Sequence, residues 1–290
     1  MKPRRDIHQS KLDWLVSPEQ VAVSSSTIAC EHHPERNEDS SFTLQRTNGL
    51  LVGAVFDGLG GHEGSEQASR TANALVQDAY TTHAPYRLSR REAEEFARAA
   101  LLDANAEINR SGRYIATTAV LASVHEDTDT IDRYVNIAWA GDSRAYVFRD
   151  GQLVYRTLDD GIAIYVPELG ELYPEVPYEY QLQTYLETVH EPIDDSGLDR
   201  LFMHRNVIEN CLGAGERPTI HTTQLSVAPG DTVLVCSDGV HDNLTNDEIQ
   251  TIIRNGGGVE ELTAAALARS RDSDHMRAKP DDITAVLMSV

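Results

Sequence analysis

The sequence is poor in positive charge. It has 46 aspartates and glutamates against 25 lysines and arginines, so its formal net charge is −21. Nucleic acids and anionic membrane surfaces favour proteins with clustered lysine and arginine, so we expect neither as a partner. A surplus of carboxylates suits cations better.

Cysteines and long hydrophobic runs are also scarce. Cys30, Cys211 and Cys236 are far apart and form no CxxC pair, so we expect them to be reduced, buried and without a chemical role. No run approaches eighteen apolar residues, and the basic start MKPRRDIHQSKLDWLV lacks the apolar core and the cleavage site of a signal peptide. We therefore expect a soluble cytoplasmic protein with no membrane partner.

The chain of 290 residues, 40% of them hydrophobic, is long enough to bury a sizeable core. Segments rich in valine, isoleucine, threonine and aromatic residues predict strands. They are residues 20–27, 50–57, 117–124, 134–141, 144–151, 231–238 and 283–290.

Four helices are predicted between these strands. Apolar residues share one face over residues 68–79, and the capping-box pair Ser89 and Glu92 opens a second helix. A further capping box starts a helix near 246–254, and 259–271 supplies the last. Short turns join several strands, so the sheets should be largely antiparallel. The pattern favours an α+β fold in which two packed sheets lie between helices.

One segment, residues 157–205, departs from this pattern. It is acidic, rich in tyrosine and proline, and weakly periodic, which is typical of an inserted flap with a solvated surface. We expect a single domain over residues 19–290 that includes this flap, preceded by an extension over residues 1–18.

Acidic residues recur where predicted strands begin or end. Turn chemistry explains each acid alone about as well as a functional role does. Strand ends of packed sheets converge, however, and carboxylates about 5 Å apart repel by roughly 3 kcal/mol per pair, so a cation should neutralise them. The acids are Glu38, Asp39, Asp57, Asp142, Asp238, Asp242, Asp281 and Asp282.

Oxygen ligands of this kind suit hard divalent cations such as Mg²⁺ and Mn²⁺, and the lack of a histidine or cysteine cluster argues against a dedicated zinc site. In the stretch VFDGLGGHEGSE we therefore interpret Asp57 as a metal ligand. Gly58 would let its own carbonyl reach the ion.

The segments RNEDS, VFDGLGGHEG, TTAV, AGDSRAYVFRDG, CSDGVHDNL and PDDITAV resemble, in order and approximate spacing, the PPM or type 2C metal-dependent protein serine/threonine phosphatases, especially bacterial members. The resemblance runs from about residue 20 to 290, interrupted by the flap. It implies an αββα four-layer sandwich with two Mn²⁺ or Mg²⁺ ions. It also implies direct hydrolysis of phosphoserine and phosphothreonine by an activated water, phosphoprotein substrates and a cognate kinase. A monomer is expected.

The resemblance implies catalytic roles for three aspartates. Asp57 would bridge both ions, and Gly58 would offer its carbonyl to one of them. Asp238 and Asp281 would complete the shell of the other ion.

Other acids match supporting positions of the family. Glu38 and Asp39 would reach the ions mostly through water. Asp142, together with Asp238 and Asp242, matches a third, weaker metal site. Asp282 would stand behind the ligands.

Two positions depart from the family pattern. Pro34 stands where the family usually has a phosphate-gripping arginine, and Arg36 and His33 are the candidates to replace it. Leu59 stands where eukaryotic members have a proton-donating histidine, and we interpret the nearby His62 as part of a structural turn.

Three rival functions remain open at this point. A phosphatase of a small phosphorylated metabolite would share every catalytic residue. A pseudophosphatase regulatory module would have lost metal ligands, yet the aspartates are all present. A dinucleotide-binding protein would need GxGxxG, but Glu63 occupies the place of the third glycine.

Overall fold

The structure, a computed structural model, describes residues 22–59, 64–161, 171, 175–191 and 196–290. The predicted extension over residues 1–18 and His62 lie outside this part. Within it, no helix is both long and apolar enough to cross a membrane. The cytoplasmic location stays a prediction.

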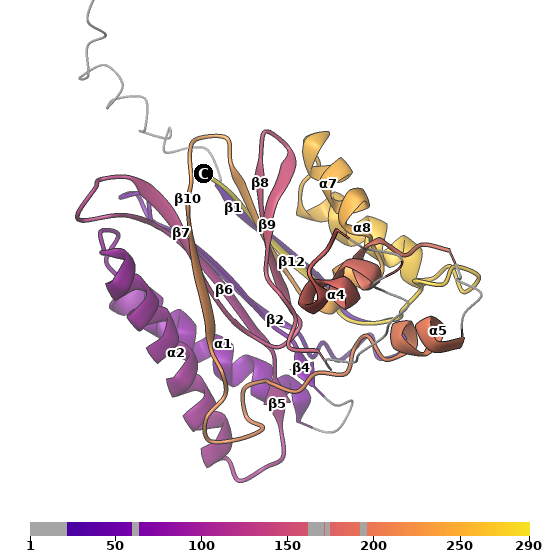
Figure 1. The fold of residues 1–290 in the computed structure, drawn as a ribbon. Coiled ribbons are helices and arrows are strands. Elements are labelled where there is room, and N and C mark those ends of the chain that lie inside the picture. The colour runs from indigo at the N-terminus through magenta and orange to yellow at the C-terminus, as the bar shows by residue number, and fades with distance from the viewer. Residues whose placement is uncertain (1–21, 60–63, 162–170, 172–174, 192–195) are drawn as a thin grey trace, which may run out of the picture.

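Two five-stranded sheets form the centre of the molecule (Figure 1). The first has the spatial order β1 (Val23–Ile28), β12 (Ile283–Ser289), β11 (Thr232–Cys236), β8 (Arg144–Arg149) and β9 (Gln152–Arg156). The second has the order β10 (His221–Ser226), β7 (Arg133–Ala140), β6 (Ala119–Glu126), β3 (Leu51–Phe56) and β2 (Ser40–Gln45). A short ladder joins β4 (Gly58–Leu59) to β5 (Ala116–Thr117). Neighbouring strands are antiparallel throughout these sheets.

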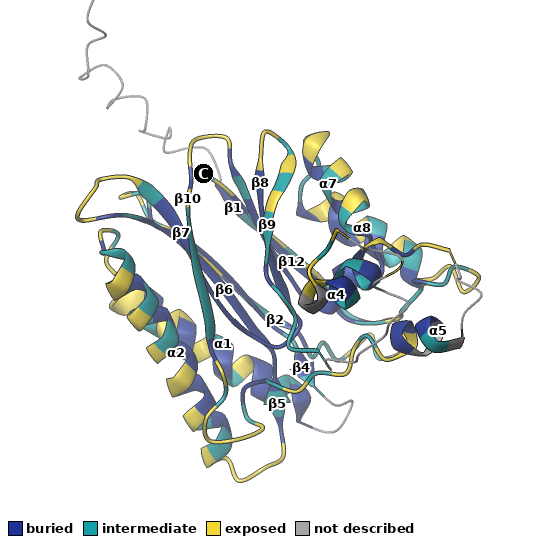
Figure 2. Cartoon of the chain, in the orientation of Figure 1, coloured by how far each residue is buried: buried dark blue, intermediate teal, exposed yellow. Residues whose placement is uncertain are grey.

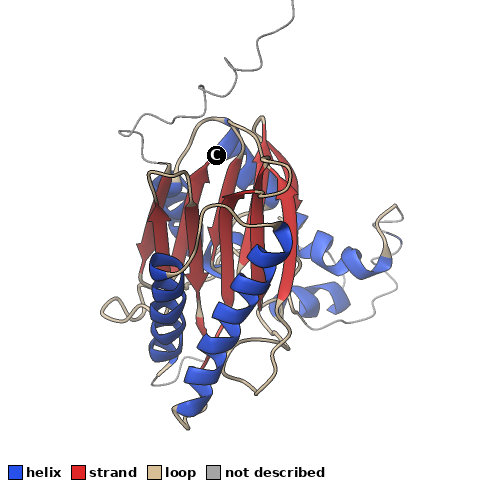
Figure 3. Ribbon diagram, turned by 90° about the vertical axis from the view of Figure 1, so that its left-hand side faces the viewer, coloured by secondary structure: helices blue, strands red, loops and turns tan. Residues whose placement is uncertain are grey.

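Helices cover the outer face of each sheet. The second sheet is covered by α1 (Ser65–Thr82) and α2 (Arg90–Arg110), which cross its face in Figure 3. The first sheet is covered by α7 (Asn246–Arg254) and α8 (Val259–Ser270). The predicted capping boxes are present at the starts of α2 and α7. The predicted α+β arrangement of two sheets between helices is confirmed.

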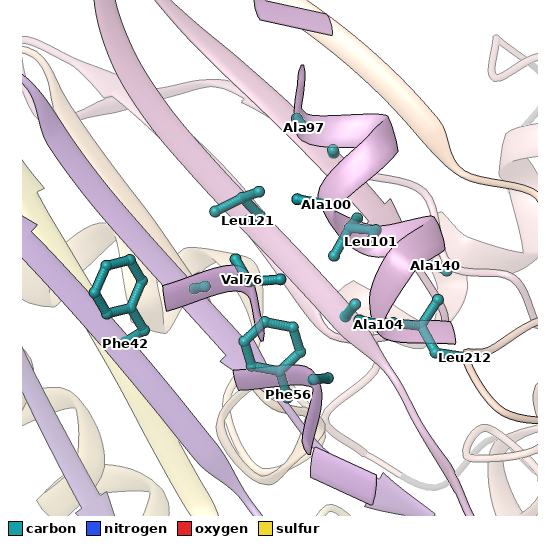
Figure 4. Packing of buried hydrophobic residues seen from close by; sticks show 14 of the residues in the cluster. Phe42, Phe56, Val76, Ala97, Ala100, Leu101, Ala104, Leu121, Ala140 and Leu212 are labelled. Atoms are coloured by element: carbon teal, nitrogen blue, oxygen red, sulfur yellow. The ribbon is translucent and has the colours of Figure 1, made fainter. Parts of the chain in front are cut away.

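Apolar side chains fill the spaces between these layers, so the central strands are buried and the outer helix faces are exposed (Figure 2). Valines such as Val55 and Val147 pack between the two sheets. In the layer between the second sheet and its helices, Val76 and Leu101 pack with Phe56 (Figure 4).

All seven predicted strands are present, and the three longer strands that the sequence did not reveal lie at sheet edges. They are β2, β9 and β10. An edge strand has only one neighbouring strand and needs less apolar side chain to be buried. Their sequences SSFTLQ, QLVYR and HTTQLS are accordingly polar and largely part-exposed.

The flap is more ordered than its sequence indicated. It contains α4 (Tyr178–Thr188) and α5 (Ser196–Met203), whose apolar side chains form a small core of their own. The prediction of a solvated acidic surface is wrong for two flap acids. Glu187 is almost fully buried and Asp159 is largely buried, and the guanidinium of the buried Arg144 lies beside both. The flap is thus attached to the first sheet through charged groups.

A single-turn helix, α6 (Asp238–His241), follows β11 directly. It packs against β11, β12 and α8 and carries one of the predicted catalytic aspartates at its first position. The other predicted ligands lie at the same end of the sheets as α6.

Candidate metal centre

The strand register brings the predicted acids to one end of the two sheets. Phe56, the last residue of β3, pairs with Ser40, the first of β2, so Asp57 and Asp39 both lie just beyond this pair. In the other sheet, Cys236 at the end of β11 pairs with the beginning of β8 and with β12 near its start. The residues that precede or follow these strand ends therefore face a common space.

The backbone of Asp57 is fixed by two threonines of the neighbouring chain segment. Its N–H donates to Thr118 Oγ1 at 3.1 Å, and its carbonyl accepts from Thr118 N and Thr117 Oγ1, each at 2.8 Å. Both threonines are fully buried. Because the backbone groups are satisfied within the fold, the carboxylate alone is presented to the site.

Glycine follows two of the aspartates because the backbone is approached closely there. A Cβ on Gly58 would lie 2.5 Å from the carbonyl oxygen of Ser65, and one on Gly239 would lie 2.0 Å from that of Asp282. Neither glycine has a positive φ. The Asp-Gly pairs therefore serve tight packing behind the acids, and the turn explanation does not apply to them.

The carboxylates interact electrostatically as one group. Burial raises the pKa of Asp57 well above its ordinary value, and the charges of Asp39, Asp238, Asp281 and Asp142 raise it further. Burial likewise raises the pKa of Asp238 to about 6, against the opposing charge of a lysine. Protein groups alone leave this cluster short of positive charge.

Three buried carboxylate oxygens in the cluster have neither a hydrogen-bond donor nor an ion-pair partner among the described residues. They are Asp39 Oδ1, Asp142 Oδ1 and Asp238 Oδ1. An unpartnered buried carboxylate oxygen is costly, and a cation satisfies it without a donor. The donor set consists of carboxylates and carbonyls, which are the ligands that Mg²⁺ and Mn²⁺ prefer. The residues present therefore fit a divalent metal centre.

Comparisons with known proteins identify the family of the chain. The family described as protein phosphatase 2C matches residues 29–279 of the chain. The chain belongs to the protein phosphatase 2C family. The predicted family resemblance is thereby confirmed, and with it the prediction of a protein serine/threonine phosphatase.

The relatives of this phosphatase have low sequence identity to it, but the similarity covers most of the chain. The serine/threonine phosphatase stp of Listeria welshimeri is 24% identical over 264 residues, which cover 89% of this chain and 90% of the relative. The serine/threonine protein phosphatase PstP of Mycobacterium tuberculosis is 24% identical over 258 residues, which cover 88% of this chain and 42% of the relative. The crystal structure of serine/threonine phosphatase Stp1 from Staphylococcus aureus has a TM-score of 0.68 at 21% identity and covers 93% of this chain and 95% of its own. This likeness confirms the αββα sandwich.

Asp282 holds the loop that carries Glu38 and Asp39. Its Oδ1 accepts from the backbone N–H of Cys30 at 2.6 Å, and its Oδ2 accepts from that of Glu38 at 2.7 Å. Asp282, His33 and Glu38 each offer one possible ligand atom, and these three atoms lie within 4.8 Å of one another. Because both carboxylate oxygens of Asp282 accept backbone hydrogen bonds, this residue positions the loop that carries Glu38 and Asp39.

The two candidates for phosphate binding lie on that same loop. Arg36 makes an ion pair with Glu38, with Nη2 and Oε1 3.0 Å apart, and remains about a third exposed. The ring Nδ1 of His33 hydrogen bonds to the carbonyl of Arg36 at 2.8 Å. The structure thus places both residues beside the predicted metal ligands, with Arg36 held against one of them.

Two cations of this phosphatase site were not anticipated from the sequence. Lys279 Nζ contacts Asp238, Asp242 and Asp281, and Arg205 from the end of the flap lies 3.2 Å from Asp242 Oδ1. Burial alone would raise the pKa of Asp242, but the charges of these two cations and of His241 lower it below its ordinary value. The only signal for Lys279 was its place immediately before PDDIT. Arg205 carried none.

Proposed function

We propose that this phosphatase hydrolyses phosphoserine and phosphothreonine in proteins through two Mn²⁺ or Mg²⁺ ions held at the acidic end of its sheets. The single observation that carries the proposal is the set of buried, unpartnered carboxylate oxygens that converge there. The proposed ligands are Asp57, the carbonyl of Gly58, Asp238 and Asp281, with Glu38 and Asp39 acting through water. The relatives named as serine/threonine phosphatases support the substrate class.

When bound, the ions would supply Lewis-acid activation of a water molecule and would neutralise charge on the phosphoryl oxygens. The chain's own residues do the positioning. The buried threonines fix the backbone of Asp57, so its carboxylate cannot withdraw from the centre. Ser237 Oγ donates to Asp39 Oδ2 at 2.8 Å and thereby ties the loop before β2 to the residue before Asp238.

Substrate binding would depend on Arg36 more than on His33. Its guanidinium is part-exposed beside Glu38, from which it can turn a free edge toward a phosphate. His33 instead uses its Nδ1 within the loop. Loss of Arg36 should therefore weaken phosphate binding more than the chemical step.

We further propose that residues 19–290 act as one catalytic domain with residues 1–18 as an extension, that the protein is a monomer, and that its counterpart is a serine/threonine kinase. The alternative of a catalytically weak regulatory module is less well supported, because the predicted metal-binding aspartates are present together. Phosphopeptide panels would distinguish a phosphoprotein substrate from a small phosphorylated metabolite.

The proposal is tested by changing one ligand at a time. Asp57→Asn and Asp238→Asn should each lower turnover of phosphopeptides with Mn²⁺ by several orders of magnitude. Each substitution removes a negative charge that holds the ions, and the ions stabilise the transition state by several kcal/mol. Turnover and circular dichroism are measured side by side, with the exposed Asp103→Asn on α2 as the matched control. Near-normal turnover in both variants, or undiminished wild-type turnover after complete chelation, would refute the metal centre.

A further inference from the structure

Lysine is rare in this chain, and one lysine lies among the acids. Only three of the 25 basic residues are lysines, namely Lys2, Lys11 and Lys279. Lys279 is thus the single lysine in the part of the chain that the structure describes. A lysine ammonium is a compact point charge with three donors, whereas the planar guanidinium of arginine is larger and forked.

The ammonium of Lys279 is shared by three carboxylates. Nζ donates to Asp238 Oδ2 in a short contact, lies 2.8 Å from Asp242 Oδ2 and lies 3.1 Å from Asp281 Oδ2. These contacts match its three N–H donors in number. The side chain is 17% exposed, so water competes little for them. The ammonium therefore occupies the position that a small cation with oxygen ligands would take.

The fold holds this lysine in place through its backbone. The buried amide side chain of Asn243 accepts from the N–H of Lys279 and donates to its carbonyl, each at 3.0 Å. The same amide also donates to the carbonyl of Gly239 at 2.9 Å. Lys279 is thus fastened to the segment that follows Asp238, and its side chain enters the site from a fixed point.

Chain cations fully engage Asp242, which the family resemblance assigns to a third metal site. Its Oδ1 lies 3.2 Å from Arg205 Nε and its Oδ2 lies 2.8 Å from Lys279 Nζ. Asp238, in contrast, keeps Oδ1 without a partner among the described residues, and Asp142 does so too. The protein cations therefore engage both oxygens of Asp242 and one oxygen each of Asp238 and Asp281, and they leave Asp238 Oδ1 and Asp142 Oδ1 for metal.

We propose that the Lys279 ammonium takes the place of the third metal ion, so that this phosphatase binds two divalent ions where the number of its acids predicts three. The inference rests on the proposed two-ion centre. It makes the third cation a covalent part of the chain, present at any metal concentration. It also implies that removing the lysine creates a site for one more ion.

The test counts metal in variants that lack this charge. Wild type, Lys279→Met and the control Arg149→Met are saturated with Mn²⁺, freed of excess ions, and analysed for Mn²⁺ per chain. Arg149 pairs with the buried Asp231 at the opposite end of β8, so its loss removes a cation from a buried acid away from the site. We expect two ions in wild type and in the control, and three in Lys279→Met.

The melting temperature of the chelated proteins gives a second readout that does not depend on activity. Chelated Lys279→Met should melt several degrees below chelated wild type, because three carboxylates lose their shared cation, and Mn²⁺ should remove most of this difference. If Lys279→Met does not fold, Lys279→Gln takes its place. Equal Mn²⁺ counts in wild type and the lysine variant overturn the inference, whatever the melting temperatures are. A wild type that binds no Mn²⁺ overturns the proposed centre and this inference together.

Nuclear magnetic resonance of the lysine ammonium groups tests the same point in the unchanged protein. With so few lysines, the Lys279 ¹⁵Nζ signal can be assigned by its absence in Lys279→Met. Titration with Mg²⁺, which is diamagnetic, should leave this signal present at two equivalents, because the ammonium stays among its carboxylates. Its loss, or its shift to the position of an exposed lysine, would show displacement by metal and would overturn the inference.

Discussion

Two buried basic side chains differ in whether burial removes their charge. Arg277 is almost fully buried, and its guanidinium donates to the carbonyls of Leu186, Val189 and His241. Burial lowers its pKa to about 10, which still leaves it charged at neutral pH. His125 is equally buried, but burial lowers its pKa to about 4, so its ring is neutral.

The neutral His125 predicts a pH dependence of stability. The unfolded chain binds a proton near the ordinary pKa of 6.5, whereas the folded chain binds it only near 4. The unfolded state therefore holds more protons between these values, and the free energy of unfolding should fall by about 3 kcal/mol as the pH drops from 6.5 to 4.

Urea unfolding at several pH values measures this loss. In His125→Asn, the free energy of unfolding should fall by about 3 kcal/mol less between pH 6.5 and 4 than in wild type. His83→Asn, at an exposed position, should show the same fall as wild type. Identical pH profiles for wild type and His125→Asn would contradict the prediction.

The sequence revealed most acids of the site because they stand beside strands with a strong apolar signal, whereas Glu38 and Asp39 precede the polar edge strand β2. Asp57 follows a continuous buried run, and Asp238 follows another. No local pattern could reveal Lys279 as part of the site, because its role depends on carboxylates that come from separate segments of the chain. Long-range partners of this kind follow only from the folded arrangement.

At the scale of secondary-structure elements, the flap is anchored by buried ion pairs. Arg144 on β8 makes two hydrogen bonds to Asp159 at 2.8 and 2.6 Å and lies 3.7 Å from Glu187 on α4. Arg156 on β9 also pairs with Glu187. A buried carboxylate between two guanidinium groups fixes the helix against the sheet, so α4 and the sheet should move together.

Removing Glu187 should therefore destabilise the flap. Glu187→Ala leaves two arginines with fewer partners in a buried position, which should cost about 3 kcal/mol. We expect a lower urea midpoint and faster proteolysis within the flap. The exposed Glu191→Ala is the matched control. A loss below about 1 kcal/mol, with unchanged proteolysis, would show that these pairs do not anchor the helix.

Secondary-structure elements that are buried on both faces were predicted well from the sequence, and those buried on one face were predicted poorly. Central strands such as β3 and β6 are almost fully buried, so their sequences are nearly continuous apolar runs. The flap helices α4 and α5 bury a small cluster mostly against each other, which requires few apolar residues. The sequence of the flap is therefore weakly periodic although it contains helices.

At the scale of the whole molecule, the net charge of −21 should act on substrate choice. Glu171, Glu175 and Glu191 add exposed acids on the flap segment. Phosphopeptides with basic flanks should have a higher kcat/KM than those with acidic flanks, since a negative surface attracts the former and repels the latter.

Salt provides the measurement for this prediction. The preference should shrink between about 0.01 M and 1 M salt, because the Debye length falls from about 30 Å to about 3 Å. The triple variant Glu171→Gln, Glu175→Gln and Glu191→Gln should show a smaller preference at low salt, with hydrolysis of a small aryl phosphate within about tenfold of wild type. A preference that is independent of salt would exclude an electrostatic origin.

The pairing of the first strand with the last has a consequence for synthesis on the ribosome. Thr27 of β1 and Thr284 of β12 join their hydroxyls at 2.7 Å although they are 257 residues apart in sequence. At a translation rate of roughly 5 to 20 residues per second, β12 is synthesised on the order of 10 to 50 s after β1. Because β12 also lies between β1 and β11, the nascent chain cannot close its first sheet during that time. It should emerge without phosphatase activity and acquire it only after translation has passed β12.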